Sequence, residues 1–321
     1  MAERSSYNVL PDHLEDEFKK AKKLEWITLA YLASVIVLMV MFMGSSQAMK
    51  TALIEDILST IPAISFLICA SFYSRKPNRT FPYGYHRVYN VGAFISSMAL
   101  TFLGLYMCYD SAHALIGQHH PTMGLITIFN QTLWEGWLMM ILLTYSFIPA
   151  LILGYKKLPL AKKLHNKVLF IDSKAQKADY STAIAAIAGI ALVGFGYWWA
   201  DSLAALFISF SVAKDGIIRL SVSTKDILDN RPETIESEEE YPVLDDIRQA
   251  IKAHDWIKDG KIRFREHGQL FYGEVFVIPN TEDDLLSKMK DLRLEILDQD
   301  WKIHDFTISV GHEYPESWGE L

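Results

Sequence analysis

The stretch TALIEDILSTIPAISFLICASF, residues 51–72, decides the fold class, because it is apolar over the length of a membrane-crossing helix and yet carries Asp56. A second stretch of this kind, SKAQKADYSTAIAAIAGIALVGF at 173–195, carries Asp179. A charged group near the centre of a bilayer costs about 2.5 to 17 kcal/mol, according to the measure used. Such groups are retained where they face a cavity and meet an ion, a proton or an opposite charge. The two stretches therefore predict a membrane protein that handles cations.

The apolar residues are unevenly distributed along the chain. Half of all residues are hydrophobic, and nearly all long apolar runs fall within residues 25–220. Residues 221–321 instead hold 24 Asp and Glu against 12 Lys and Arg, a net charge of −12, although the whole chain carries only −7. We therefore predict a polar tail at 1–24, a transmembrane domain at 25–220 and an acidic soluble domain at 221–321. The acidity argues against nucleic acid as a partner.

Six apolar segments reach, or come close to, the roughly 20 residues that a membrane-crossing helix needs. Lys and Arg gather in the N-terminal tail and in the second and fourth loops, whereas the third and fifth loops contain none. Because positively charged loops stay in the cytoplasm, we expect both termini on that side of the cell's inner (plasma) membrane. We place the spans at 25–45, 50–73, 88–116, 132–155, 174–195 and 200–219.

The soluble part shows the periodicities of a small α+β domain. Two amphipathic helical patterns and three alternating strand patterns follow one another in the order helix, strand, strand, helix, strand. This order predicts a ferredoxin-like αββαβ domain, with a tight turn at His267 and Gly268. Such a sheet can pair with a copy of itself, so we expect a homodimer. The first helix should bury Val243, Leu244, Ile247, Ala250 and Ile251.

The intramembrane aspartates have neighbours that could complete a cation site. Hard divalent cations prefer oxygen ligands, whereas zinc also accepts imidazole. Residues four apart share a helix face, so Thr60 accompanies Asp56 on the second span. Ala175 and Asp172 lie on the face of Asp179. We predict that the transport site is formed by Asp56, Asp179 and Thr60. Asp172, two turns nearer the cytoplasm, could act at its mouth.

Two longer strings resemble a known family. RKPNRTFPYGYHR at 75–87 resembles the loop and the Y-G-x-x-R signature between the second and third spans of the cation diffusion facilitators. The stretch from Trp198 to Glu233 resembles their sixth span and the L-x-D-x-x-P-E exit into the soluble domain. The resemblance implies a homodimeric transporter, not an enzyme and without a cofactor. It would export a metal cation by alternating access while a proton moves inward.

The resemblance also implies a transport site that this chain matches only in part. The family has His or Asp followed by Asp four residues later on the second span, and likewise on the fifth. Asp56 and Asp179 match, whereas Thr60 and Ala175 stand where a second carboxylate and a histidine belong. The missing imidazole favours an oxygen-preferring divalent ion over zinc. Magnesium, manganese, iron(II), cobalt and a monovalent ion all remain open.

Two alternatives remain open, and the first follows from the missing ligands. The chain could be a transport-inactive scaffold or metal sensor on the same fold. The two aspartates could also form an ion pair or hydrogen-bonded cap that only fixes helix packing.

Several neighbours are accessory candidates. Glu55 could serve an entry path, and Gln176 and Asn90 each offer a carbonyl oxygen. Lys177 either extends to the cytoplasmic headgroups or forms a salt bridge to Glu55 or Asp56 that opens as the ion arrives. The histidines of the soluble part form no tight ligand triplet, so we interpret them as ordinary surface residues. These are His254, His267, His304 and His312.

Overall fold

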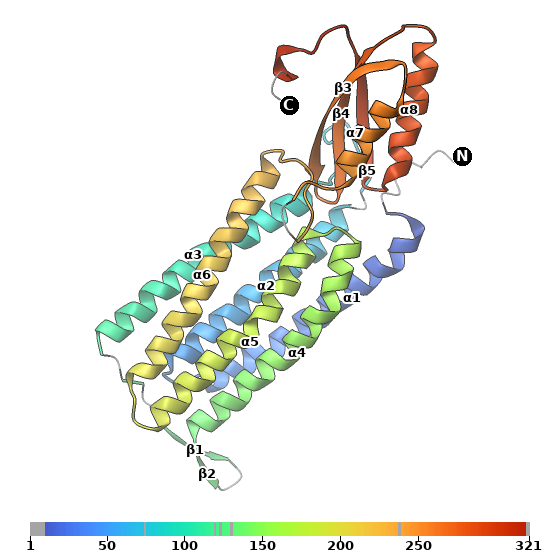
Figure 1. The fold of residues 1–321 in the computed structure, drawn as a ribbon. Helices are drawn as coiled ribbons and strands as arrows, with labels where there is room; N and C mark the ends of the chain where they lie inside the picture. Colours follow the sequence, from blue (N-terminus) through green and yellow to red (C-terminus); the bar gives the residue numbers. More distant parts are fainter. Residues whose placement is uncertain are drawn as a thin grey trace. The chain divides into compact units, whose positions relative to one another are not determined.

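The computed structural model divides the chain into two compact units (Figure 1). The bundle unit comprises residues 16–72 and 89–224, and the sheet unit comprises residues 1–15, 73–88 and 225–321. The side chains of residues 126–128, 131, 177–179 and 317 are not described. The structure describes residues 10–73, 75–118, 120–121, 124–128, 131–236 and 239–318.

Six long helices make up the bundle (Figure 1). The first four of them are long and apolar enough to cross a membrane. The fifth and sixth are 28 and 29 residues long. The helices are α1 (Asp12–Phe42), α2 (Gln47–Tyr73), α3 (Val88–Ile116), α4 (Glu135–Lys163), α5 (Lys167–Gly194) and α6 (Trp199–Ile227).

The helices extend beyond the apolar spans that the sequence predicts. The largest difference is at α4, which continues to Lys163, so the residues expected in the fourth loop are mostly helical. Buried Leu160 and Ala161 keep the end of α4 packed. Asn166 then caps α5, because its side chain accepts a hydrogen bond from the Leu169 amide at 3.0 Å. A short turn at residues 164–166 therefore separates the two helices, whereas the predicted apolar spans end at 155 and resume at 174.

A small hairpin precedes α4 and lies at the end of the bundle where that helix begins (Figure 1). It consists of β1 (Leu125–Ile128) and β2 (Gln131–Trp134), which pair antiparallel. The fourth helix therefore begins at Glu135, close to the predicted start of the span at 132. The consecutive β-branched residues Ile126, Thr127 and Ile128 of β1 favour a strand over a helix.

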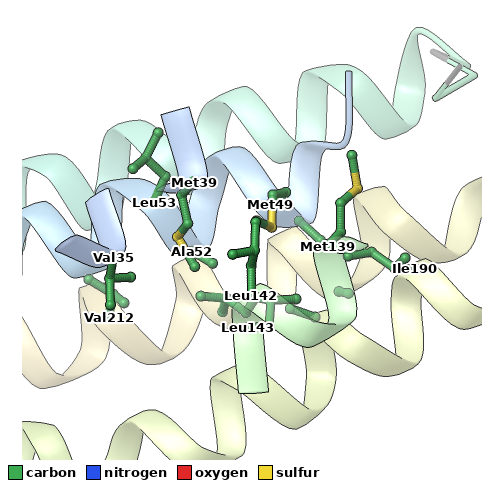
Figure 2. Packing of buried hydrophobic residues seen from close by; sticks show 14 of the residues in the cluster. Val35, Met39, Met49, Ala52, Leu53, Met139, Leu142, Leu143, Ile190 and Val212 are labelled. Carbon is green, nitrogen blue, oxygen red and sulfur yellow. The ribbon is translucent and has the colours of Figure 1, made fainter. Parts of the chain in front are cut away.

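An apolar core joins five of the helices (Figure 2). Val35 and Met39 of α1 meet side chains of α2, α4, α5 and α6 in one buried cluster. Between α3 and α6 the contact depends on small residues. A Cβ atom on Gly216 would lie 2.6 Å from the Thr101 nitrogen, so only glycine permits this approach.

The sheet unit contains the helix, strand, strand, helix, strand order that the sequence predicts. Strands β3 and β4 pair antiparallel, and β5 pairs parallel to β4, giving the order β3-β4-β5. Gly268 has φ of 72° in the turn between β3 and β4, where a left-handed conformation favours glycine. All five residues expected inward on the first helix are buried. The elements are α7 (Val243–Ala253), β3 (Ile257–His267), β4 (Leu270–Pro279), α8 (Leu285–Gln299), β5 (Ile303–Val310) and the short 3-10 helix η1 (Glu316–Trp318).

Candidate functional site

A small pocket of about 40 Å³ lies in the bundle unit, between α2, α3, α5 and α6. Glu55 and Ser59 line it from α2, one helical turn apart, because residues four apart share a face. Ser211, Asp215 and Arg219 repeat this spacing on α6. Among the described lining residues there is neither an imidazole nor a thiol. The lining consists of Glu55, Ser59, Leu100, Ala175, Thr182, Ser211, Val212, Asp215 and Arg219.

The pocket lining contains charged groups of both signs. Arg219 lies 3.9 Å from an Asp215 oxygen, and its guanidinium also donates a hydrogen bond to the Ile171 carbonyl of α5 at 2.7 Å. Glu55 adds a second carboxylate. The described lining therefore contains two carboxylates and one guanidinium.

Asp56 points away from this lining and toward α4. It is only 8% exposed, and the Ser146 hydroxyl lies 3.0 and 2.9 Å from its two carboxylate oxygens. The Ser146 carbonyl in turn accepts a hydrogen bond from the Tyr31 hydroxyl of α1. Asp56 therefore joins a hydrogen-bonded chain across α2, α4 and α1. Thr60, one turn further along α2, donates its hydroxyl proton to the Ile57 carbonyl at 2.6 Å.

The side chains of Asp179 and Lys177 lie outside the described residues, although both belong to α5. The backbone nevertheless fixes the position of residue 179 on the helix. It stands four residues after Ala175 and three before Thr182, and both of these line the pocket. Positions three and four apart share a helix face, so position 179 belongs to the face that the pocket-lining residues occupy.

Two of the remaining candidates belong to a second buried network. Asp172 is 1% exposed and accepts a hydrogen bond from Lys157 of α4 at 2.5 Å. The Gln176 amide nitrogen lies 3.4 Å from the Asp172 oxygens. Asn90 is buried in α3 and is not part of the pocket lining.

Lys157, one of the basic residues that the sequence places after the fourth span, is not exposed. It lies in α4, is wholly buried and forms a second ion pair with Glu25 of α1 at 2.9 Å. Sequence reasoning also missed Glu25, because it stands at the polar start of the first apolar run. One signal could have identified Glu25: it stands thirteen residues after Asp12, where α1 begins, and so lies well inside that helix.

Asp201 is another buried carboxylate that the sequence did not single out. From α6 it accepts hydrogen bonds from the Ser46 hydroxyl and the Gln47 amide, both at 2.6 Å, and from the Ala48 amide at 3.3 Å. These groups form the start of α2, where free amides and the helix dipole favour a negative charge. Asp201 is therefore held by hydrogen bonds from the start of α2.

No three His, Cys, Asp or Glu side chains among the described residues converge in a way that would hold a metal ion. The pocket instead combines carboxylates with the hydroxyls of Ser59, Thr182 and Ser211. Its chemistry is that of oxygen donors, which suits hard cations.

A sequence model of the cation efflux transmembrane domain matches residues 26–228, more than half of the chain. The chain belongs to the cation efflux family. This confirms the resemblance to the cation diffusion facilitators. The cation efflux family consists of multi-pass membrane transporters and not of enzymes, and its transported substrate is a metal cation.

Two curated relatives of this cation efflux protein are distant. The manganese efflux system protein MneS of Bacillus subtilis (strain 168) is 23% identical over 201 residues, which cover 62% of this chain and 65% of MneS. The uncharacterized transporter MJ0449 of Methanocaldococcus jannaschii is 21% identical over 183 residues, which cover 57% of this chain and 60% of MJ0449. The matches therefore span less than two thirds of the length of either relative.

The sheet unit of this cation efflux protein contains a second group of titratable side chains. His86, from the segment before α3, stacks edge-on against His304 of β5, with ring centres 5.4 Å apart. Burial lowers the pKa of His86 to about 4, and the neighbouring His304 adds to this. Burial and the charge of Arg87 lower the pKa of His267 to about 3. Both histidines are 6% exposed, so the interpretation of His267 as a surface residue is wrong.

Proposed function

We propose that this protein exports a divalent metal cation from the cytoplasm, with Mn²⁺ as its preferred substrate, in exchange for protons. The observation that carries the proposal is the oxygen-donor pocket between α2, α3, α5 and α6. Mn²⁺ prefers carboxylate, carbonyl and water oxygens, whereas zinc sites usually include imidazole or thiolate. The name of MneS, a manganese efflux protein, supports the same ion.

In this proposal Glu55 and Asp179 are the carboxylates that bind the ion in the conformation described. Asp56 stands one residue from Glu55, about 100° around the helix. A rotation of α2 would exchange Glu55 and Ser59 for Asp56 and Thr60 at the pocket. Alternating access could therefore use one carboxylate pair in each state, with Asp179 common to both. Metal and protons would compete for these oxygens.

We further propose that α5 and α6 cross the membrane with the other four helices, giving six spans. Both termini would lie in the cytoplasm, since the Lys and Arg residues of the connecting segments favour that side of the inner membrane. The boundaries at residues 24 and 220 would separate tail, transmembrane domain and cytosolic domain. The α7-β3-β4-α8-β5 order supports a ferredoxin-like cytosolic domain, through which two copies would associate.

The test is ion flux into liposomes that contain the purified protein. We expect Mn²⁺ to be transported faster than Zn²⁺, Mg²⁺ or Co²⁺, and Asp179→Asn to abolish Mn²⁺ flux. Asp110→Asn is the control, because Asp110 lies outside the pocket lining and pairs with Lys50 at 2.8 Å. Faster Zn²⁺ than Mn²⁺ flux would contradict the assignment of the ion. Flux of no divalent ion at all would favour the transport-inactive scaffold.

A further inference from the structure

A charged triad lies inside the bundle unit, apart from the residues that line the pocket. Lys157 of α4 donates to Glu25 Oε2 of α1 at 2.9 Å and to Asp172 Oδ2 of α5 at 2.5 Å. Glu25 and Lys157 are 0% exposed and Asp172 is 1% exposed. A charged triad this deeply buried is expensive to maintain unless every charge is compensated.

The charges of the triad are not balanced when all three groups are ionised. Two carboxylates against one ammonium leave a net charge of −1 in surroundings that exclude water. The charged groups acting on Glu25 are Asp172 and Lys157, and those acting on Lys157 are the two carboxylates. Among the described residues, Lys157 is the cation that contacts both carboxylates. One added proton would leave a neutral acid beside a balanced Lys157–Asp172 pair.

The geometry also offers a place for that proton. Glu25 Oε1 is buried and makes no hydrogen bond with any described residue, although Oε2 is bound to Lys157. The Gln176 carbonyl oxygen is buried and unpaired in the same way, while its amide nitrogen lies against Asp172.

The triad is connected to the pocket through α5. The carbonyl of Ile171, the residue before Asp172, accepts the hydrogen bond of Arg219, which lines the pocket. Gln176 is preceded by Ala175, which also lines the pocket. A change in charge at the triad can therefore reach the pocket through packed and hydrogen-bonded groups.

We propose that the Glu25–Lys157–Asp172 triad is a proton-binding site of the exchange cycle, separate from the metal pocket, with Glu25 as the group that carries the proton. The inference rests on the proposed function for the role of the proton in transport. A metal ion is a poorer occupant than a proton, because the Lys157 ammonium already contacts both carboxylates. A proton needs only one free oxygen, and Glu25 Oε1 provides it.

The experiment is the steady-state accumulation of Mn²⁺ in liposomes under an imposed gradient of one pH unit, with the membrane voltage clamped. Each coupled proton multiplies the accumulation ratio by about tenfold per pH unit, since one pH unit is a tenfold difference in proton activity. We expect Glu25→Gln to transport Mn²⁺ but to lower the ratio about tenfold. Accumulation at the wild-type ratio would overturn the proposal. A slower rate alone does not change a steady-state ratio.

Three variants accompany this measurement. Glu25→Asp keeps a titratable group and should keep the wild-type ratio. Glu17→Gln is the matched control, because Glu17 also pairs α1 with a lysine of α4, Lys163 at 3.1 Å, but at the surface. It should leave the ratio unchanged. If Glu25→Gln does not fold, Asp172→Asn removes the same net charge and should lower the ratio equally.

A second measurement separates this proposal from the proposed function. Infrared difference spectra of the wild-type protein, titrated without metal, should contain the band of a protonated buried carboxyl that Glu25→Gln removes. If wild-type protein moves no Mn²⁺ but shows this band, the metal assignment fails and the proton site stands. If no such band is found at any pH, the proton site fails. A Na⁺ gradient could instead drive Mn²⁺ accumulation in the absence of a pH gradient, with the effect lost in Glu25→Gln. That result would overturn the proposal, because the triad would then bind a sodium ion and not a proton.

Discussion

Asp201 of α6 accepts a hydrogen bond from the Ser46 hydroxyl at 2.6 Å and thereby attaches the start of α2 to a helix 155 residues further along the chain. Its other oxygen accepts the Gln47 amide. Because α2 carries both Glu55 and Asp56, the position of these carboxylates depends on an anchor more than two turns away.

The anchor leads to a prediction about stability. Asp201→Ala should lower the free energy of unfolding by about 1–3 kcal/mol, because it leaves buried donors at the start of α2 without an acceptor. Thermal unfolding of the purified protein in detergent measures this. Asp110→Asn is the control, since the half-exposed Lys50–Asp110 pair should contribute at most about 1 kcal/mol. Equal effects of the two variants would show that Asp201 is not an anchor.

A second prediction concerns the pocket. Glu55→Gln should raise the Mn²⁺ concentration for half-maximal flux by about 10–100-fold or more. Replacing even a residue that only hydrogen-bonds to a metal ligand commonly weakens metal binding by about 10–100-fold. Ser59→Ala should have a smaller effect in the same direction, because a neutral hydroxyl is the weaker ligand. Asp16→Asn, on the exposed part of α1, is a control that should change nothing. If Mn²⁺ flux depends on Mn²⁺ concentration in the same way in Glu55→Gln as in the wild type, Glu55 does not bind the ion.

The buried lysine gives a third prediction. Lys157→Met should destabilise the protein by about 3–5 kcal/mol, because it leaves two buried carboxylates without a cation. Adding Glu25→Gln to this variant should recover part of the loss, since only one carboxylate then remains. Lys163→Met removes an exposed partner of Glu17 and should cost no more than about 1 kcal/mol. Unfolding midpoints of these variants and of the Glu25→Gln single variant decide the matter, and additive effects in the double variant would contradict the interaction.

A fourth prediction follows from His86 and His267, whose pKa values lie at about 4 and 3 in the folded protein. An unfolded histidine has a pKa near 6.5, so the unfolded chain binds more protons below that pH. The stability that these groups provide is therefore complete above about pH 6.5 and is lost as the pH falls toward 4. The expected slope is about 1.4 kcal/mol per pH unit for each group.

Unfolding midpoints of the whole protein between pH 7 and pH 5 test this dependence. His86→Gln should make the dependence shallower, because the glutamine does not titrate. The exposed His312→Gln should leave it unchanged. A wild-type protein that is equally stable across this range would contradict the neutral, buried state of the two histidines.

The sequence by itself determined the kind of structure. Apolar runs of about 20 residues predict helices, because within a membrane each backbone group must find its partner inside its own segment. Periodicity was sufficient for the sheet unit as well. It identified the order of α7 to β5 and the buried residues of α7, such as Ile247, since the spacing of apolar residues reports directly which side of an element is covered.

Only the tertiary structure decided which charges meet. The sequence indicates that Glu55 and Asp56 point to different sides of one helix, but the neighbouring helices determine that Glu55 lines the pocket while Asp56 bonds to Ser146. Lys156 and Lys157 look alike in the sequence, yet α4 buries Lys157 against Glu25. A charge is compensated through space, by groups that may stand more than a hundred residues away, and no local pattern contains that information.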